Sequence, residues 1–193
     1  MPNYQVGFWQ HFSRLLKFGG REDRGSFWPW ALSAAGLAMV LLMAGMLPVM
    51  ANVFANAQQY AVEHPDQVTV THGPGEYGVS IHGDAPGLMP DMTGMFVMLA
   101  VAFGVAICLL GAAVARRLHD RGLAGWWGLM PVPFILYSAV QMPAFFGTAR
   151  AGKQPDMTIF FSVFFSNMLY LASLVMLIIL LSKQGDPVEN QYG

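Results

Sequence analysis

Four long apolar stretches dominate the hydrophobic pattern of this chain. None contains Asp, Glu, Lys, Arg or His, and they cover residues 27–50, 95–115, 126–146 and 157–181. A helix rises about 1.5 Å per residue, so roughly 20 apolar residues cross a hydrocarbon core about 30 Å thick. Each stretch reaches that length. The pattern therefore predicts an all-α membrane protein, a single membrane domain over residues 1–193 with four transmembrane helices.

The third stretch is interrupted by Pro131, Pro133 and Pro143. Proline removes a helix hydrogen bond, and a membrane tolerates the break where neighbouring helices or water satisfy the freed carbonyl groups. We expect a kinked helix packed inside the bundle. The alternative is a broken helix that lines a substrate path, as in transporters.

Lys and Arg gather on one side of the predicted spans. Eight lie before the first span, between the second and third, or after the fourth, whereas only Arg150 and Lys153 lie between the third and fourth. The positive-inside rule then places both termini, including a tail over residues 182–193, in the cytoplasm. Amphipathic tryptophan rings settle at membrane interfaces, and we expect this of Trp28, Trp30, Trp126 and Trp127.

The segment over residues 4–18 has the period of an amphipathic helix. Phe8, Phe12, Leu15 and Leu16 recur at helical spacing, and polar or basic residues occupy most other positions. Such a helix tends to lie in the headgroup plane of a membrane. We therefore predict an interfacial helix; the alternative is a helix packed on the bundle or on a partner.

Residues 51–94 form a predicted extracytoplasmic loop that is acidic and lacks Lys and Arg. Within it, residues 67–72 and 77–82 carry alternating or β-branched residues on either side of Gly-Pro-Gly. This arrangement predicts a small β-hairpin.

Composition and charge narrow the class of protein. Hydrophobic residues make up 55% of the chain and charged residues 11%, too few charges to cover a soluble domain and too apolar for a disordered chain. The net charge of −1 excludes a broadly basic nucleic-acid binder. The single cysteine, Cys108, excludes an internal disulfide and a Cys-based zinc site.

Three histidines of the acidic loop raise the question of a metal, because imidazole suits zinc, copper or nickel. They are His64, His72 and His82. Their spacing matches no standard site, so we predict neither a metal nor another cofactor.

Small and polar residues within the spans point to helix packing. The second span has a small residue every four positions, at Ala100, Gly104, Cys108 and Ala112, a ridge that lets another helix approach. The third and fourth spans carry polar residues, among them Ser138, Gln141, Ser162, Ser166, Asn167 and Ser173. Polar groups in hydrocarbon need partners, so we expect interhelical hydrogen bonds.

Three clusters outside the spans carry a recognisable pattern. The first contains Phe18, Gly20, Arg21, Arg24, Phe27 and Trp28. The second contains Arg116, Arg117, Leu118, His119, Asp120, Gly122, Gly125, Trp126 and Trp127. The third contains Asn190, Tyr192 and Gly193.

On these residues the chain resembles the bacterial inner-membrane "domain of unknown function 805" family, from about residue 18 to its end. Ala124 stands where that family usually has serine, and the loop after the first span is longer than in typical members. The resemblance implies a four-helix protein of the bacterial inner membrane, and it implies no established activity.

The basic clusters supply the candidate site. If the topology is as predicted, the cytoplasmic rim of the bundle carries Arg21, Arg24, Arg116, Arg117, His119, Asp120, Arg121, Trp126 and Trp127. Arginine presents a planar fork of donors that suits phosphate, and basic clusters at the cytoplasmic ends of membrane helices are typical of sites for anionic lipid headgroups. We therefore predict a non-enzymatic protein that binds anionic lipid or a membrane-protein partner there, with self-association open. Plain anchoring of the helix ends explains the same residues equally well.

Two other functions are weaker. An oligomeric channel or small-solute transporter is supported only by the kinked third span and its polar residues, and the spans hold no ionisable side chain. An enzyme with His119 as base and Asp120 as helper is disfavoured, because adjacent helix residues point about 100° apart.

Overall fold

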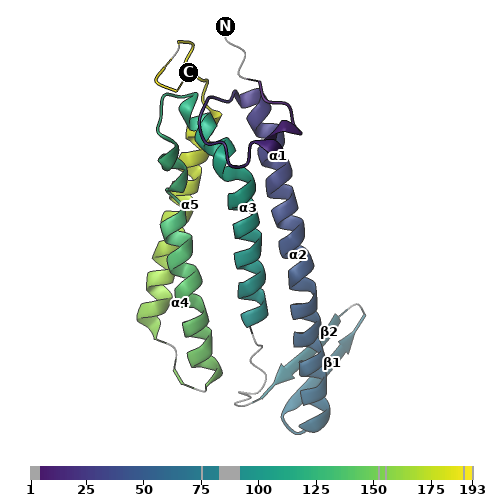
Figure 1. The fold of residues 1–193 in the computed structure, drawn as a ribbon. Helices are drawn as coiled ribbons and strands as arrows, with labels where there is room; N and C mark the ends of the chain where they lie inside the picture. The colour runs from purple at the N-terminus through teal and green to yellow at the C-terminus, as the bar shows by residue number, and fades with distance from the viewer. Residues whose placement is uncertain are drawn as a thin grey trace.

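Four helices long and apolar enough to cross a membrane run side by side through the chain (Figure 1). The computed structural model describes residues 5–74, 76–82, 92–151, 153–154, 156–188 and 190–192. The helices are α2 (Arg24–Glu63), α3 (Thr93–His119), α4 (Val132–Arg150) and α5 (Met157–Ser182). The prediction of four apolar spans is confirmed.

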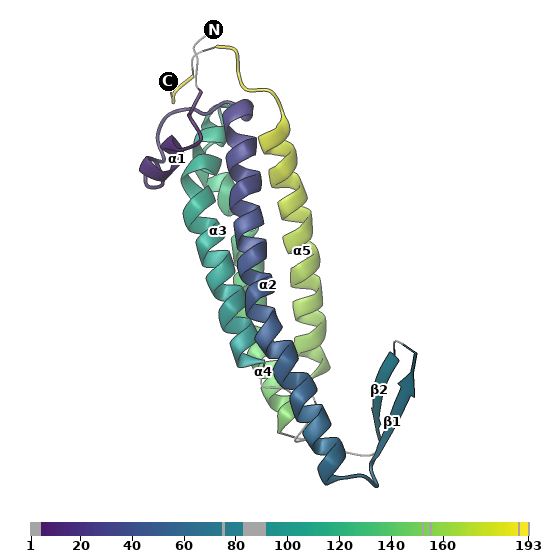
Figure 2. The same ribbon diagram turned by 90° about the vertical axis from the view of Figure 1, so that its right-hand side faces the viewer.

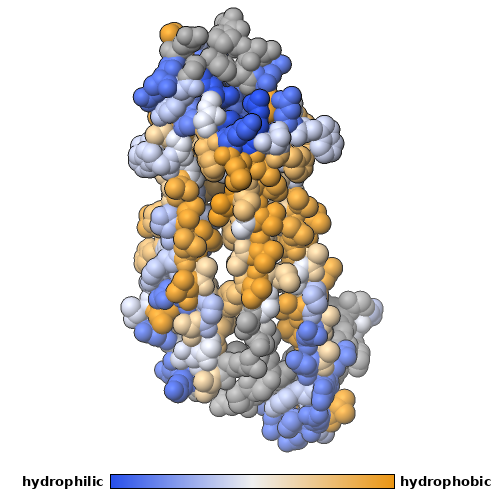
Figure 3. All heavy atoms as spheres, in the orientation of Figure 1, coloured by the Kyte–Doolittle hydropathy of each residue, from blue (hydrophilic) through white to orange (hydrophobic). Residues whose placement is uncertain are grey.

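An apolar belt surrounds the middle of the helices. Figure 3 shows hydrophobic residues in that belt and hydrophilic residues at both ends of the molecule. Both chain termini lie at the same end, the upper one in Figures 1 and 2. We call this the termini end, and it is where the three sequence clusters meet.

Helix α2 is longer than the first apolar stretch predicts. It has 40 residues, about 60 Å at 1.5 Å per residue, roughly twice the hydrocarbon thickness. Residues 51–63, assigned above to a loop, continue the helix, so that part of the prediction is wrong. These residues are rich in alanine and glutamine, which favour a helix without membrane burial.

The third span begins with a change of helix type. A 3₁₀ helix, η2 (Gly125–Leu129), precedes α4. Pro131 lies just before α4 and Pro133 in its first turn, where no backbone donor is needed, so only Pro143 interrupts the ladder of α4. The expectation that this span packs inside the bundle is wrong, because α4 keeps an exposed outer face that includes Leu136 and Val140.

The N-terminal segment forms only one helical turn, α1 (Gln10–Ser13). The prediction of a helix over residues 4–18 is therefore wrong in extent, and its first residue lies outside the described residues. The carbonyl groups of Arg14 and Lys17 accept hydrogen bonds from Arg116 of α3. Beyond α1 the chain forms turns, in which the Arg14 carbonyl also accepts from the Lys17 amide at 3.0 Å.

A two-stranded antiparallel sheet follows α2, with β1 (Val68–Gly73) and β2 (Glu76–Ile81). Val68 lies opposite Ile81 in the register. These bounds differ by one residue at each end from the strands expected above. The hairpin stands away from the helices beside the end of α2 (Figure 2), and residues 83–91 are outside the described residues.

The buried core lies toward the termini end. Helix α2 packs along α3 and α4 along α5, while α3 also packs against η2. The core residues are Phe27, Trp30, Ala31, Ala113, Leu118, Leu177 and Leu181. Trp30, expected at the interface, is buried and donates from Nε1 to the Leu109 carbonyl at 3.0 Å.

Polar side chains join α4 to α5, as predicted for Ser138, Ser162, Ser166 and Asn167. The prediction fails for Ser173, which bonds the Tyr170 carbonyl of its own helix, and for Gln141, which has no hydrogen bond to the described residues. The Ser166 hydroxyl donates to the Phe134 carbonyl at 3.0 Å, and the Asn167 amide donates to Ser138 Oγ at 3.2 Å. Of the small-residue ridge on α3, only Ala112 is buried, and Gly104 has no described heavy atom within 4 Å of an added Cβ. The ridge is therefore largely uncovered within a single chain.

Gly125→Ala should disturb the packing of η2 on α3. An added Cβ would lie 2.9 Å from the Ala115 Cβ and 3.3 Å from its Cα, which cannot move without the helix. We expect a loss of about 1–3 kcal/mol and a lower unfolding temperature, measured by tryptophan fluorescence in detergent. Gly36→Ala, where nothing lies within 4 Å, is the matched control and should be neutral or stabilising. Equal unfolding temperatures for the two variants would contradict this account.

Candidate functional site

Arg117, near the end of α3, is at the centre of the termini end and is fully buried. Its Nε donates to the Leu181 carbonyl at 3.0 Å and its Nη2 to the Lys183 carbonyl. Its Nη1 reaches the Asp120 carboxylate and the Glu22 carbonyl. One side chain thus ties the end of α3 to the end of α5 and to the residues before α2.

Arg116 points to the other side of α3. Its Nε donates to Glu22 Oε2 at 2.8 Å, and its Nη1 donates to the carbonyls of Arg14 and Lys17 at 3.0 and 2.6 Å. Glu22, itself fully buried, holds His11 with its other oxygen at 2.8 Å. Arg116 therefore fixes the N-terminal segment against α3.

His11 completes this contact from α1. Its Nδ1 lies 3.1 Å from the Phe8 carbonyl, and its ring stacks on Trp30 at 4.8 Å between centroids. The side chain is almost fully buried. One polar residue of the segment predicted to lie in the headgroup plane is thus part of the protein interior.

Arg21 holds the C-terminal tail. Its Nε donates to Asp120 Oδ1 at 3.1 Å, and its remaining nitrogens donate to the carbonyls of Asp186 and Val188. The backbone amide of Asp186 donates to the Asp120 carbonyl at 2.8 Å. The tail approaches so closely that a Cβ on Gly185 would lie 2.0 Å from Asp120.

His119 and the last described residues form a second tail contact. The His119 ring stacks on Tyr192 with centroids 3.9 Å apart, and its Nδ1 lies 3.2 Å from the Gly20 carbonyl. The Asn190 amide donates to the His119 carbonyl at 3.0 Å. Two of the three residues of the third sequence cluster thus contact the second cluster; Gly193 is outside the described residues.

We call Arg21, Arg116 and Arg117, with Glu22 and Asp120, the arginine network. It buries three positive charges with two negative ones. The difference is offset by carbonyl groups, two of which, those of Leu181 and Lys183, lie at the end of α5, where the helix dipole is negative. Arg121 adds to this by donating to the Leu180 carbonyl at 2.8 Å.

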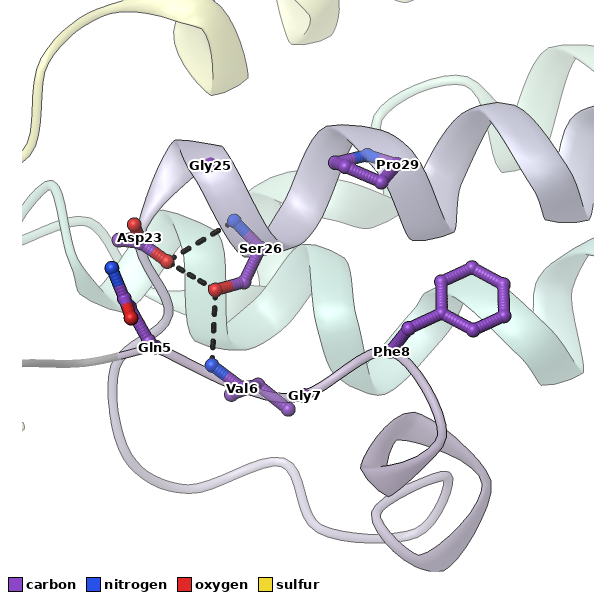
Figure 4. Close-up of a pocket in the computed structure, with 8 residues that line it drawn as sticks. All are labelled: Gln5, Val6, Gly7, Phe8, Asp23, Gly25, Ser26 and Pro29. Atoms are coloured by element: carbon purple, nitrogen blue, oxygen red, sulfur yellow. Dashed lines mark hydrogen bonds between the residues drawn. The ribbon is translucent and has the colours of Figure 1, made fainter.

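The start of α2 is anchored separately. Asp23 caps the helix by accepting from the amide and the hydroxyl of Ser26, and the Ser26 hydroxyl accepts from the Val6 amide at 2.9 Å (Figure 4). An open pocket of about 410 Å³ lies between residues 5–8 and this first turn. Its only described carboxylate, Asp23, is engaged by the cap.

The structure divides the predicted site residues into two groups. Arg21, Arg116, Arg117 and Asp120 come together and are buried, so the expectation of an exposed rim is wrong for them. Arg24 is exposed and makes no hydrogen bond or ion pair with the described residues, and His119 and Arg121 are half-buried. Trp126 is 61% exposed and stacks on Trp127, which packs against the core.

Sequence reasoning missed Glu22, His11 and the tail carbonyls. Glu22 stands between Arg21 and Arg24 in the first cluster, and a buried arginine needs a carboxylate partner. That signal was available. The sequence holds no such signal for the carbonyl partners of the arginines, because every residue has a backbone carbonyl.

The histidines of the acidic segment do not converge where they are described. His82 Nε2 lies 3.0 Å from the Thr69 hydroxyl, while the His64 ring stacks on Tyr60. Among the described residues, no group of three or more His, Cys, Asp and Glu side chains could hold a metal ion.

The three clusters that form this site also agree with a known family. The family model described as "Protein of unknown function (DUF805)" matches residues 15–193, which include the arginine network and the tail. The chain belongs to the DUF805 family. No curated protein and no solved structure matches it.

In this DUF805 protein the arginine network joins segments that are distant in sequence. It connects the N-terminal segment, the start of α2, the end of α3 and the tail after α5. Its donors are directed at internal oxygens, so its chemistry is that of a structural joint.

Arg117→Lys should weaken this joint strongly. Lysine has one compact ammonium group and cannot reach four acceptors on three segments. Removing one partner from a buried ionic cluster costs about 3–5 kcal/mol, so we expect a large fall in unfolding temperature. Arg24→Lys, at an exposed position, is the matched control. If both variants unfold at the wild-type temperature, the network is not a stability determinant.

Proposed function

We propose that this DUF805 member is a non-enzymatic protein of the bacterial inner membrane that binds anionic phospholipid at the termini end, which faces the cytoplasm. The binding groups are the exposed basic side chains outside the arginine network, Lys17, Arg24 and Lys183, with the half-buried Arg14 and Arg121 beside them. The buried arginines hold the bundle end in shape. This proposal keeps the predicted ligand and changes the residues that contact it.

The observation that carries the proposal is the sorting of basic residues by burial. Lys17, Arg24 and Lys183 are exposed, whereas Arg21, Arg116 and Arg117 are buried and bonded internally. Exposed basic residues beside the apolar belt attract anionic headgroups by about 1 kcal/mol each.

Exposed apolar side chains at the same end favour a lipid over a water-soluble ligand. Trp9 is 76% exposed and Leu16 87% exposed in the N-terminal segment, and Trp126 is exposed in η2. Tryptophan with nearby Lys and Arg is typical of the membrane–water interface. A headgroup here can be held by charge while its acyl chains lie along the apolar belt.

The charge balance of the two ends supports the same orientation. The sequence places eight basic and five acidic residues at the termini end, against two basic and six acidic residues in the segments at the opposite end. The positive-inside rule then favours a cytoplasmic termini end.

Lipid retention tests the binding proposal. Native mass spectrometry of protein released from nanodiscs containing phosphatidylglycerol should show retained anionic lipid. The triple variant Lys17→Gln, Arg24→Gln, Lys183→Gln should lose it by at least about tenfold, because three surface charges are removed. These side chains make no described hydrogen bonds, so the variant should fold.

The matched control for this experiment is Arg150→Gln with Lys153→Gln at the opposite end of the molecule, and it should retain the lipid. Lipid-free protein in the wild type would refute the proposal and favour a protein partner at the same rim. Equal loss in both variants would show that the effect is not specific to the termini end.

Reporter fusions test the orientation. A fluorescent protein that matures only in the cytoplasm should be bright when fused to either terminus. Alkaline phosphatase, which is active only outside the cytoplasm, should be active when inserted between Gly73 and Glu76. The opposite pattern would invert the topology and remove the argument for anionic cytoplasmic lipid.

A further inference from the structure

The open pocket beside the start of α2 has an amphiphilic lining. Gln5, Asp23 and Ser26 lie at one end of it, while Phe8 and Pro29 lie toward the other end (Figure 4). Its volume of about 410 Å³ is within the range of about 300–1,000 Å³ that is typical of small-molecule sites. The pocket can therefore take a ligand that has one polar and one apolar part.

The apolar end of the pocket is the one nearer to the apolar belt. Helix α2 enters the belt from Arg24, and Pro29 lies six residues after the Asp23 cap, about 9 Å farther along the axis. Both Phe8 and Pro29 are exposed. An amphiphile in the pocket thus has its polar group at the termini end and its apolar part directed toward the belt, which is the orientation of a phospholipid.

Hydrogen bonds fix the walls of the pocket and leave one oxygen available. The Ser26 hydroxyl donates to Asp23 Oδ1 and accepts from the Val6 amide at 2.9 Å, which holds the N-terminal segment against the first turn of α2. The Ser26 amide donates to the same Asp23 oxygen at 3.2 Å. Asp23 Oδ2 makes no hydrogen bond to the residues that the structure describes, so one oxygen of a half-buried carboxylate can accept from a ligand.

Arg24 supplies the opposite charge beside this carboxylate. It follows Asp23 in the chain, is exposed, and makes no hydrogen bond or ion pair with the described residues. An ionised carboxylate only accepts hydrogen bonds, and an arginine only donates them. Together the two side chains complement a ligand in which a cationic donor and an anionic acceptor lie close together.

We propose that this pocket binds the headgroup of a phospholipid that carries a primary ammonium group, as in phosphatidylethanolamine. The ammonium donates to Asp23 Oδ2, the phosphate accepts from Arg24, and the acyl chains pass Phe8 and Pro29 into the apolar belt. A primary ammonium has three N–H donors and therefore suits the free carboxylate oxygen.

This site goes beyond the anionic-lipid proposal and does not rest on it. Its ligand has no net charge, and it needs neither Lys17 nor Lys183. The two proposals share only Arg24, so variants at the other positions can separate them.

Lipid competition tests the headgroup. Nanodiscs can hold equal amounts of phosphatidylethanolamine and phosphatidylcholine with the same acyl chains, which differ only in the methyl groups that replace the N–H donors of the ammonium. Native mass spectrometry of the released wild-type protein should show phosphatidylethanolamine retained about three- to tenfold over phosphatidylcholine, since a charge-assisted bond at a half-buried carboxylate is partly screened. Equal retention of the two lipids would overturn the proposal.

Asp23→Asn tests the carboxylate. Asparagine is as good an N-cap as aspartate, so its Oδ1 can keep the bonds from Ser26 while an amide donor replaces Oδ2 and the charge is lost. We expect the preference for phosphatidylethanolamine to disappear and the unfolding temperature to stay close to wild type. The matched control is Asp156→Asn, which should keep the preference. Asp156 also caps a helix, α5, by accepting from the Thr158 amide at 2.8 Å, but at the opposite end of the molecule.

A further pair of measurements separates this site from the anionic-lipid proposal. The double variant Lys17→Gln, Lys183→Gln should lose phosphatidylglycerol and keep the preference for phosphatidylethanolamine, whereas Asp23→Asn should do the reverse. A preference that survives Asp23→Asn, or that Asp156→Asn removes equally, would overturn the pocket assignment alone. A wild-type protein that is free of phosphatidylglycerol but prefers phosphatidylethanolamine would refute only the anionic-lipid proposal.

Discussion

The cost of burying an arginine beside an apolar belt is the constraint on which the termini end depends. A buried guanidinium must be neutralised and its donors satisfied, or the site loses several kcal/mol. Arg117 meets this requirement with Asp120 and with carbonyls from before α2 and after α5. The partners have to be brought from different parts of the chain, so satisfying one side chain fixes the relative positions of three helices.

Below the arginine network the helices are joined more sparingly. Helix α2 packs along α3, and α4 packs along α5. Away from η2, α3 contacts the α4–α5 pair at fewer positions. Lipid tails are as apolar as leucine, so no hydrophobic effect draws apolar helices together inside a membrane. The network and the packing of η2 therefore carry most of the connection between the two helix pairs, and the hydrogen bonds of Ser166 and Asn167 hold the second pair together.

The anionic-lipid proposal concerns charged groups that this internal bonding leaves over. They are the exposed basic side chains around the arginine network, Lys17, Arg24 and Lys183. The buried arginines find acceptors within the fold and hold its end in shape. Exposed charges beside an apolar belt instead favour contacts outside the chain, and anionic headgroups fit that position.

The sequence by itself determined the number of spans, because uncharged stretches of sufficient length have no other stable position than across a membrane. It also indicated the polar contacts between α4 and α5 and the three clusters that identify the family. Only the tertiary structure decided which arginines are buried. Arginine near a helix end is equally suited to anchoring and to ion pairing, and the choice depends on Glu22 and on carbonyls from residues up to 167 positions away. Amphipathic spacing also could not show that α1 is one turn long, or that the carbonyls of Arg14 and Lys17 bond Arg116, because these contacts join residues about 100 positions apart.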